Sequence, residues 1–306
     1  MIRSLSVRWG LAALAVIAIG FAGAVFAQPP ADPWAVTIET GALHRWASAV
    51  DGGGDLSVDT WAVGAGVDYA AHPDWRAGLS VGYGERRYAF SGDGDFTGLD
   101  PWSNVHDMRV SGSLNWRADK RWNLFAVPTM HWNAERGASL NDGFSGGLLA
   151  AASYRVNDRL SIGPGFGVLS ELDDGVDWFP VLAIDWQITD TLRLHTGRGL
   201  AASRGPGLTL SWEPSERWSF ALGGRYEKVR FRLDDMGLAP GGIGEETSLP
   251  LFLGATRSFG PNLRFSIFAG ADLDGGLRLQ DRDGRVIERA DYDTAPFGGA
   301  TLDLRF

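Results

Sequence analysis

Few side chains in this sequence have the types and the spacing that catalysis or metal binding requires. The chain has no cysteine, and its five histidines are His44, His72, His106, His131 and His195. None of them lies in an HExxH motif, and there is no cysteine with which one could form a zinc site. We therefore expect no metal site and no cofactor, and we identify no catalytic residue.

One acidic, glycine-rich segment at 91–103 remains a candidate for chemistry. Asp93 and Asp95 lie in it, and His106 and Asp107 follow at the start of the next alternating segment. The run from Asp93 to Asp95 is similar to the start of a calcium loop, but the remaining ligands and the closing Glu are missing. An acidic loop rich in glycine is usually a solvated turn.

A repeated pattern predicts the elements that would hold such residues. Five times an aromatic residue is followed by five mostly polar residues and then by Trp or Leu. The motifs span Tyr69–Trp75, Trp116–Trp122, Tyr154–Leu160, Trp186–Leu192 and Trp212–Trp218. Apolar and polar residues alternate on both sides of each motif, which indicates strands joined by short turns.

We expect the two apolar ends of each motif to face each other across the turn. In that register Asp68 faces Arg76 and Asp185 faces Arg193, and such pairs contribute about 0.2–1 kcal/mol each. Aromatic rings at the same height on successive hairpins are typical of a membrane barrel, where they lie at the level of the lipid headgroups. The expected girdle consists of Tyr69, Trp75, Trp116, Trp122, Tyr154, Trp186, Trp212, Trp218 and Phe306. The sequence thus predicts an all-β fold, a transmembrane antiparallel up-and-down β-barrel.

The chain divides into fourteen predicted strands with the short polar turns on the periplasmic side. We expect strands at 34–49, 55–70, 75–90, 104–117, 121–135, 143–156, 159–171, 176–188, 191–203, 206–213, 217–233, 247–258, 262–280 and 285–306. Twelve strands are the main alternative, through a fused or non-spanning hairpin near 191–213 or 136–157. The sixth turn, at 258–262, has Arg257 where an aromatic residue is expected, so its register is the least defined.

The two ends of the chain fit export to an outer membrane. Residues 1–27 contain Arg3 and Arg8 and then an uncharged run from Leu11 to Ala27, as in a cleavable Sec-type signal peptide. An uncleaved anchor is the alternative. Residues 28–306 then form a single barrel domain. The final strand, which ends at Phe306, resembles the C-terminal strand of bacterial outer-membrane proteins, and the resemblance implies recognition by the barrel-assembly machinery.

Composition excludes several other classes of protein. After the signal no apolar stretch approaches the roughly 18 residues that a spanning helix requires. Removal of Arg3 and Arg8 with the signal changes the net charge from −9 to −11, so nucleic acid is not an expected partner. Without cysteine there is no disulfide framework. The expected partners are outer-membrane lipid and lipopolysaccharide, which divalent cations could link to the acidic residues Asp173, Asp174, Asp234, Asp235, Asp281 and Asp283.

The alternation assigns residues to a lipid-facing set and a lumen-facing set. The lipid-facing set comprises Val36, Ile38, Val63, Val67, Leu79, Val81, Val110, Leu114, Leu124, Leu182, Ile184, Leu208, Leu210, Phe220, Leu222, Leu251, Leu253, Phe265, Ile267, Leu302 and Leu304. The pore-lining candidates are Asp68, Arg76, Arg109, Asp185, Arg193, His195, Arg225, Glu227, Arg264, Asp272 and Asp303. The opposite assignment would expose arginines to lipid at about 2–4 kcal/mol each. Any one of these charges could instead be part of a ladder that stabilises the barrel.

In its turns and girdle the mature chain resembles the uncharacterised proteobacterial outer-membrane β-barrel domain proteins, which implies architecture but no site. A passive channel for small polar solutes, in the outer membrane of a Gram-negative bacterium, is the function we expect. A closed structural or adhesive barrel is the alternative, with the segments 91–103 and 234–247 folded inward or binding outside partners. A remote alternative is an enzyme such as an omptin-like protease, because omptins use paired Asp and Asp–His groups at the rim. Only Asp93, Asp95, His106 and Asp107 match that pattern, so we expect no enzyme.

Overall fold

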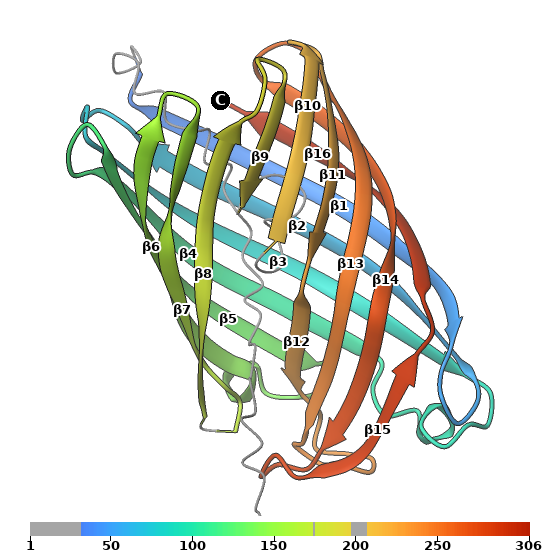
Figure 1. The fold of residues 1–306 in the computed structure, drawn as a ribbon. Helices are drawn as coiled ribbons and strands as arrows, with labels where there is room; N and C mark the ends of the chain where they lie inside the picture. Colours follow the sequence, from blue (N-terminus) through green and yellow to red (C-terminus); the bar gives the residue numbers. More distant parts are fainter. Residues whose placement is uncertain (1–31, 174, 197–206) are drawn as a thin grey trace, which may run out of the picture.

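The computed structural model describes residues 32–173, 175–196 and 207–306, which form one antiparallel sheet closed into a barrel (Figure 1). The predicted signal peptide, Asp174 and residues 197–203 of the predicted strand 191–203 lie outside the described residues. The strands are β1 Trp34–Ala49, β2 Asp55–Tyr69, β3 Trp75–Ser91, β4 Asn104–Arg117, β5 Trp122–Glu135, β6 Phe144–Asn157, β7 Leu160–Ser170, β8 Val176–Gln187, β9 Leu192–Thr196, β10 Gly207–Ser215, β11 Trp218–Arg225, β12 Glu227–Arg232, β13 Ile243–Ser258, β14 Leu263–Gln280, β15 Val286–Tyr292 and β16 Ala295–Arg305.

These segments make fourteen strands around the barrel, which confirms the predicted fold class and strand number. Both β11 and β12 pair with β13, so they form one strand interrupted at Tyr226. Similarly, β15 and β16 both pair with β14 and form one strand interrupted after Tyr292. The pairing of β1 with β16 closes the barrel. The alternative prediction of twelve strands is therefore wrong.

Short turns connect the strands at one end of the barrel, here called the turn end, and longer connections lie at the opposite loop end (Figure 1). In three of the five repeated turns the third of the five polar residues accepts two backbone N–H groups. The Asp119 carboxylate accepts from Arg121 and Trp122 at 2.6 and 2.7 Å. Asn157 and Thr189 accept in the same way from the second and third residues after them. Side chains of this kind favour tight turns because they satisfy backbone donors locally.

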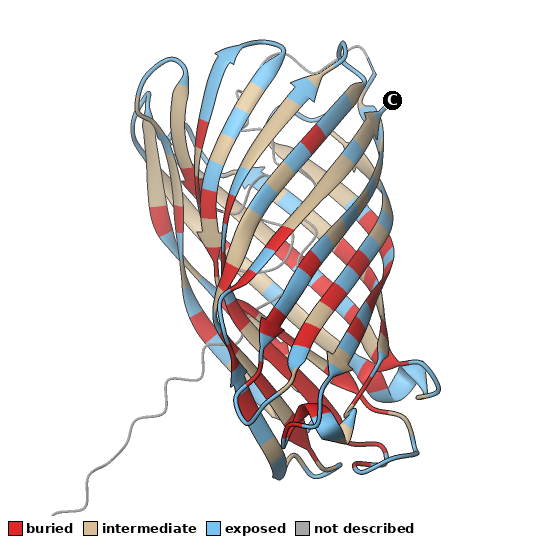
Figure 2. Cartoon of the chain, turned by 90° about the vertical axis from the view of Figure 1, so that its right-hand side faces the viewer, coloured by how far each residue is buried: buried red, intermediate tan, exposed pale blue. Residues whose placement is uncertain are grey.

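The outward face of the barrel is apolar between two bands of aromatic residues. Every predicted lipid-facing residue is exposed or partly exposed, and exposure alternates along the strands (Figure 2). A second outward aromatic band, which we had not predicted, comprises Trp46, Trp61, Tyr83, Trp132 and Trp178, eight to twelve residues along the strands from the turn-end aromatics. With a rise of about 3.3 Å per residue and a tilt of about 40°, the bands lie roughly 20–30 Å apart, the height of an outer-membrane apolar band. No helix among the described residues is long and apolar enough to span a bilayer.

The barrel narrows at the loop end because β12, which is paired with β13, also bridges to β5 at its last residue. Arg232 of β12 forms a parallel bridge with Ala134 of β5. On the other side Val50, just after β1, bridges to Tyr292 of β15. The segments β1–β5 and β12–β15 therefore form a smaller closed ring at this end, from which β6–β10 are excluded.

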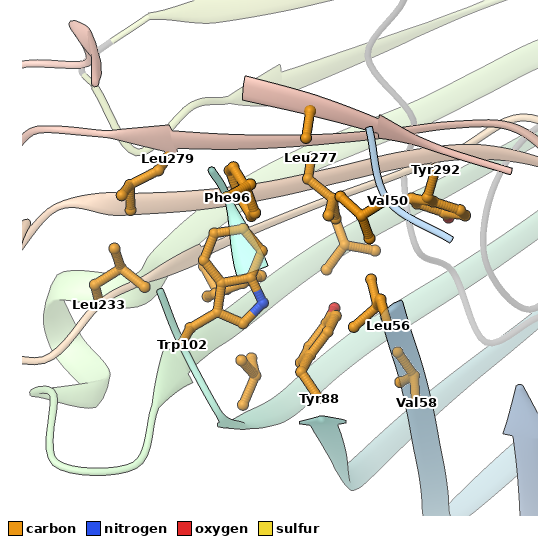
Figure 3. Packing of buried hydrophobic residues seen from close by; sticks show 14 of the residues in the cluster. Val50, Leu56, Val58, Tyr88, Phe96, Trp102, Leu233, Leu277, Leu279 and Tyr292 are labelled. Atoms are coloured by element: carbon orange, nitrogen blue, oxygen red, sulfur yellow. The ribbon is translucent and has the colours of Figure 1, made fainter. Parts of the chain in front are cut away.

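A hydrophobic core fills this smaller ring (Figure 3). Val58, Tyr88 and Val105 come from β2, β3 and β4, whereas Phe231 and Leu277 come from β12 and β14 on the opposite wall. The segment 91–103 folds into the ring, where Phe96 and Trp102 are 1% and 2% exposed. Trp102 packs edge-on against Tyr88 and Phe231, with ring centroids 6.0 and 5.3 Å apart. The lumen at the loop end is therefore packed like the interior of a globular protein.

Candidate channel lumen

The predicted girdle residues lie on the outward face of the turn end, but their pairing differs from the predicted register. Tyr69 faces Ala77, Trp116 faces Leu124 and Trp186 faces Leu194. In each case the partner lies two residues beyond the one predicted. A shift by two keeps every side chain on the same face of the strand, so the assignment of inward and outward residues is unaffected.

Girdle residues of neighbouring hairpins face each other in register. The residue that closes one turn faces the residue that opens the next, as in the pairs Trp75–Trp116, Trp122–Tyr154, Leu160–Trp186 and Leu192–Trp212. The rings of Trp122 and Tyr154 are 5.1 Å apart. Arg257, which stands where an aromatic was expected, lies over the Trp218 ring at 5.4 Å, and Phe306 is 66% exposed beside β1.

Two predicted lumen charges on β8 and β9 form a close ion pair. Arg193 donates Nε and Nη2 to the two carboxylate oxygens of Asp185 at 2.6 and 2.5 Å. The residue directly opposite Asp185 is His195, so the expected facing of Asp185 with Arg193 is corrected to a diagonal contact. His195 is 6% exposed, and its Nε2 lies 2.9 Å from Ser211 Oγ on β10.

The predicted pair of Asp68 with Arg76 needs the same correction. Asp68 faces Gly78 on β3, and Arg76 faces Asn115 on β4.

At the closure of the barrel Asp303 lies between Glu39 of β1 and Arg264 of β14 in register. A carboxylate that faces another carboxylate directly across a pair of strands is unfavourable unless a positive group is near.

A buried ionic layer separates the loop-end core from the rest of the lumen. Arg45 of β1 donates Nη1 to Glu246 of β13, to Asp272 of β14 at 3.1 Å and to the hydroxyl of Tyr292 at 2.9 Å. The hydroxyls of Tyr292 and Tyr88 donate to the two oxygens of Glu246 at 3.1 and 2.7 Å. All five residues are less than one tenth exposed. A charged group this deeply buried is retained only with partners of opposite charge.

The ionic layer continues to the facing walls through Glu227. One of its carboxylate oxygens accepts from Arg86 of β3 at 3.3 Å, and the other accepts from Nε and Nη2 of Arg225 at 3.2 and 3.1 Å. Arg225, Glu227 and Asp272 are three of the pore-lining candidates that the sequence predicts. The structure brings these three into one layer, and whether they line a conducting path stays a prediction.

A second ionic cluster lies on the other face of β12, against the β7–β8 connection. Lys228 donates to Glu171 at 3.2 Å and to Asp177 at 3.3 Å. Arg230 donates to Glu171 and, at 3.1 Å, to Asp173. The sequence carries a signal for this arrangement that we missed. On β11 the apolar residues Phe220 and Leu222 face outward, but after Tyr226 the apolar positions change parity to Val229 and Phe231.

A cavity of about 170 Å³ lies in the lumen on the turn-end side of the ionic layer. Phe252, Phe268 and Phe297 form one wall, from β13, β14 and β16. The lumen-facing charged residues that line it are Glu39, Arg86, Asp107, Arg109, Arg225 and Asp303. Apolar and charged groups of both signs thus meet in one space. The three phenylalanines were absent from the predicted site because strong inward apolar residues were not expected in a polar lumen.

The candidate catalytic residues do not form a site. His106 points outward, where its Nδ1 lies 2.8 Å from the Tyr83 hydroxyl. Its neighbour Asp107 points inward and lines the cavity. Adjacent strand residues project to opposite faces, so the two cannot act as a dyad. Asp93 and Asp95 lie in the connection between β3 and β4. Among the described residues no group of three or more His, Asp or Glu side chains could hold a metal ion.

Comparison with known proteins shows the fold. No protein-family model and no curated protein matches the sequence. An outer-membrane channel from Pseudomonas putida F1 has a similar structure, with a TM-score of 0.51, 11% identity and coverage of 90% of this chain and 97% of that chain. A FadL homologue from Pseudomonas aeruginosa aligns with a TM-score of 0.46 and 14% identity over 90% of each chain. The chain is therefore an antiparallel β-barrel with the fold of outer-membrane barrels.

Proposed function

We propose that this protein is a passive channel for small polar solutes in the outer membrane of a Gram-negative bacterium, reached by Sec-type export. The observation that carries the proposal is the lumen on the turn-end side of the ionic layer. There a cavity of about 170 Å³ is lined by charged groups of both signs. Two outward aromatic bands with an apolar zone between them support a position in the membrane, in contact with lipid and lipopolysaccharide.

A closed structural barrel is the second candidate, and one observation favours it. The hydrophobic core inside the loop-end ring lies across the lumen, with Trp102 only 2% exposed. In the channel proposal this core is a closed state, and solutes pass when the segment 91–103 moves out of the ring. In the alternative the core is permanent.

Planar-bilayer recordings of the wild-type protein and the Trp102→Ala variant distinguish the two. The substitution removes a large part of the core, at a cost of about 3–5 kcal/mol in folding free energy. We expect conductance in the wild type and a higher open probability in the variant. The variant Trp116→Ala, which removes an outward girdle ring, is the control and should leave open probability unchanged. Absence of conductance from all three proteins would favour the closed barrel.

A further inference from the structure

The cavity beside the ionic layer combines features that together indicate one kind of ligand. Its apolar wall is made by three phenylalanines, with Leu43 packed against two of them. The volume of about 170 Å³ is comparable to the roughly 150 Å³ of an engineered apolar cavity that holds benzene. A six-membered ring or a branched alkyl group therefore fits against this wall.

Positive and negative groups lie on different strands around the same cavity. Glu39 of β1 and Asp303 of β16 face each other in register next to the phenylalanine wall. The guanidinium of Arg225 lies 6.0 Å from the centre of the Phe252 ring in that wall. Arg109 of β4 is 6% exposed and also lines the cavity.

The lumen-facing charges that line the cavity balance, with Glu39, Asp107 and Asp303 against Arg86, Arg109 and Arg225. A ligand with one charge would gain attraction from one set and meet repulsion from the other. A ligand with both charges and an apolar group can satisfy all three kinds of wall at once. The ammonium can lie at the facing carboxylates, where the adjacent aromatic faces also favour a cation. The carboxylate can accept from guanidinium donors, which suit it best.

We propose that this cavity binds a small zwitterion with an apolar group, of which the apolar α-amino acids are the simplest members. The inference deepens the proposed channel function by naming its solute class, and it rests on that function only for the transport of the ligand. Binding can be measured without any flux.

Four ligands test the proposal on the wild-type protein in lipid nanodiscs by isothermal titration calorimetry. L-phenylalanine carries all three groups, 3-phenylpropionate lacks the ammonium, 2-phenylethylamine lacks the carboxylate, and glycine lacks the ring. We expect saturable binding of L-phenylalanine, with each of the other three weaker by about tenfold or more, because a lost charged hydrogen bond or ring contact costs at least that. Equal affinity for 3-phenylpropionate or 2-phenylethylamine, or no saturable binding of L-phenylalanine, would overturn the proposal.

Matched variants assign each ligand group to its wall. In Phe268→Ala the affinity for L-phenylalanine should no longer exceed the affinity for glycine. Phe265→Ala, on the outward face of the same strand, should leave this difference in affinity unchanged. In Arg109→Gln the affinity for L-phenylalanine should no longer exceed that for 2-phenylethylamine. In Glu39→Gln it should no longer exceed that for 3-phenylpropionate. Arg257→Gln, which removes an outward guanidinium, is the charge control. If L-phenylalanine keeps its full advantage over all three ligands in Phe268→Ala, Arg109→Gln and Glu39→Gln, the ligand binds elsewhere and the proposal fails.

The outcomes separate this inference from the channel function. Selective binding in nanodiscs without conductance in bilayers would support the binding site and contradict the proposed channel function. Conductance without selective binding would support the channel function and contradict the proposed binding site.

Discussion

At the scale of single residues, Arg45 is the cation that lies between two buried carboxylates of the ionic layer. Its guanidinium contacts Glu246, Asp272 and Tyr292, and its exposed fraction is 4%. Two carboxylates depend on this one cation, so its loss would leave buried negative charge without compensation. The packing of Tyr292 adds a steric constraint, because a Cβ on Gly275 would lie 2.1 Å from its ring.

The variant Arg45→Met tests this role. We expect it to lower the free energy of unfolding by about 3–5 kcal/mol, the usual cost of removing one partner of a buried ion pair. The matched control is Arg285→Met, which removes the exposed 3.4 Å pair with Asp283 and should cost about 0–1 kcal/mol. Urea unfolding in lipid vesicles, followed by tryptophan fluorescence, measures both. Equal small losses would mean that water or other groups compensate the two carboxylates.

Arg225 is the residue at which charge selectivity is best tested. It lies in the lumen at the edge of the cavity and shares Glu227 with Arg86. Changing Arg225 to Glu places two carboxylates together and makes the layer more negative by two charges, so an open channel should shift toward cations. The reversal potential under a salt gradient measures the shift. Leu222→Ala, on the outward face of the same strand, should lower stability without changing selectivity, and an open channel that shows no shift in Arg225→Glu excludes this residue as a determinant.

At the scale of elements, the third of the five polar residues accepts two backbone N–H groups in three of the repeated turns. The N–H groups of Arg121 and Trp122 hold the pKa of Asp119 below its ordinary value. A carboxyl whose pKa is lowered by folding stabilises the fold at pH values above its unfolded pKa of about 3.9, and loses that effect as the pH falls through its lower folded value.

Two variants test this turn. Asp119→Ala should lower the urea midpoint at pH 7, because the backbone donors lose their acceptor. Asn is the residue at the same position of another repeated turn, Asn157. Asp119→Asn should therefore have a urea midpoint at pH 7 close to that of the wild type. Its midpoint should fall less than that of the wild type between pH 5 and about pH 3. Unfolding curves at pH 3, 5 and 7 measure this. An Asp119→Ala midpoint equal to that of the wild type would show that the turn closes without the side chain.

The strands could be predicted from the sequence because a lipid-facing strand must alternate. Predicted and observed strands agree closely from 34 to 187, and the fourteen-strand count follows from them. The register across each turn was wrong by two residues, since hydrophobicity reports only the face and not the pairing partner. The bridge between β12 and β5 joins Arg232 and Ala134, which are about a hundred positions apart in the sequence. The only sequence signal for this contact is that the apolar residues change from even to odd positions after Tyr226.

At the scale of the whole molecule, the barrel has two differently built halves. The loop-end half is a narrow ring with a hydrophobic core and an ionic layer beneath it. The turn-end half is the wider fourteen-strand barrel with a polar lumen and a cavity. Of the charged residues that line the cavity, the sequence analysis predicted Arg109, Arg225 and Asp303 but not Glu39, Arg86 and Asp107. It also did not predict the phenylalanine wall, because inward apolar residues break the alternation rule only at isolated positions. The two halves explain why a barrel with a charged lumen can still be closed at one end.

The orientation of these halves in the membrane is the remaining property of the whole molecule. Short turns are periplasmic in outer-membrane barrels, whereas longer loops face the outside. The chain has no cysteine, so one introduced thiol at each end reports its own side. Asp119 is a suitable turn-end position. At the loop end Gly53 is unsuitable because its φ is +109°, and Asp283, whose side chain is 74% exposed, is better.

We expect Asp283→Cys to react with a membrane-impermeant maleimide in intact cells and Asp119→Cys to react only after the outer membrane is permeabilised. The reason is that the closed loop-end core, the ionic layer and the bilayer all separate the turn end from the outside, so a reagent of that size has no path to it. Labelling of both variants after permeabilisation is the control for thiol reactivity. The reverse result in intact cells would invert the barrel, and it would then place the phenylalanine-walled cavity on the outer side of the ionic layer, where solutes would meet it before the core.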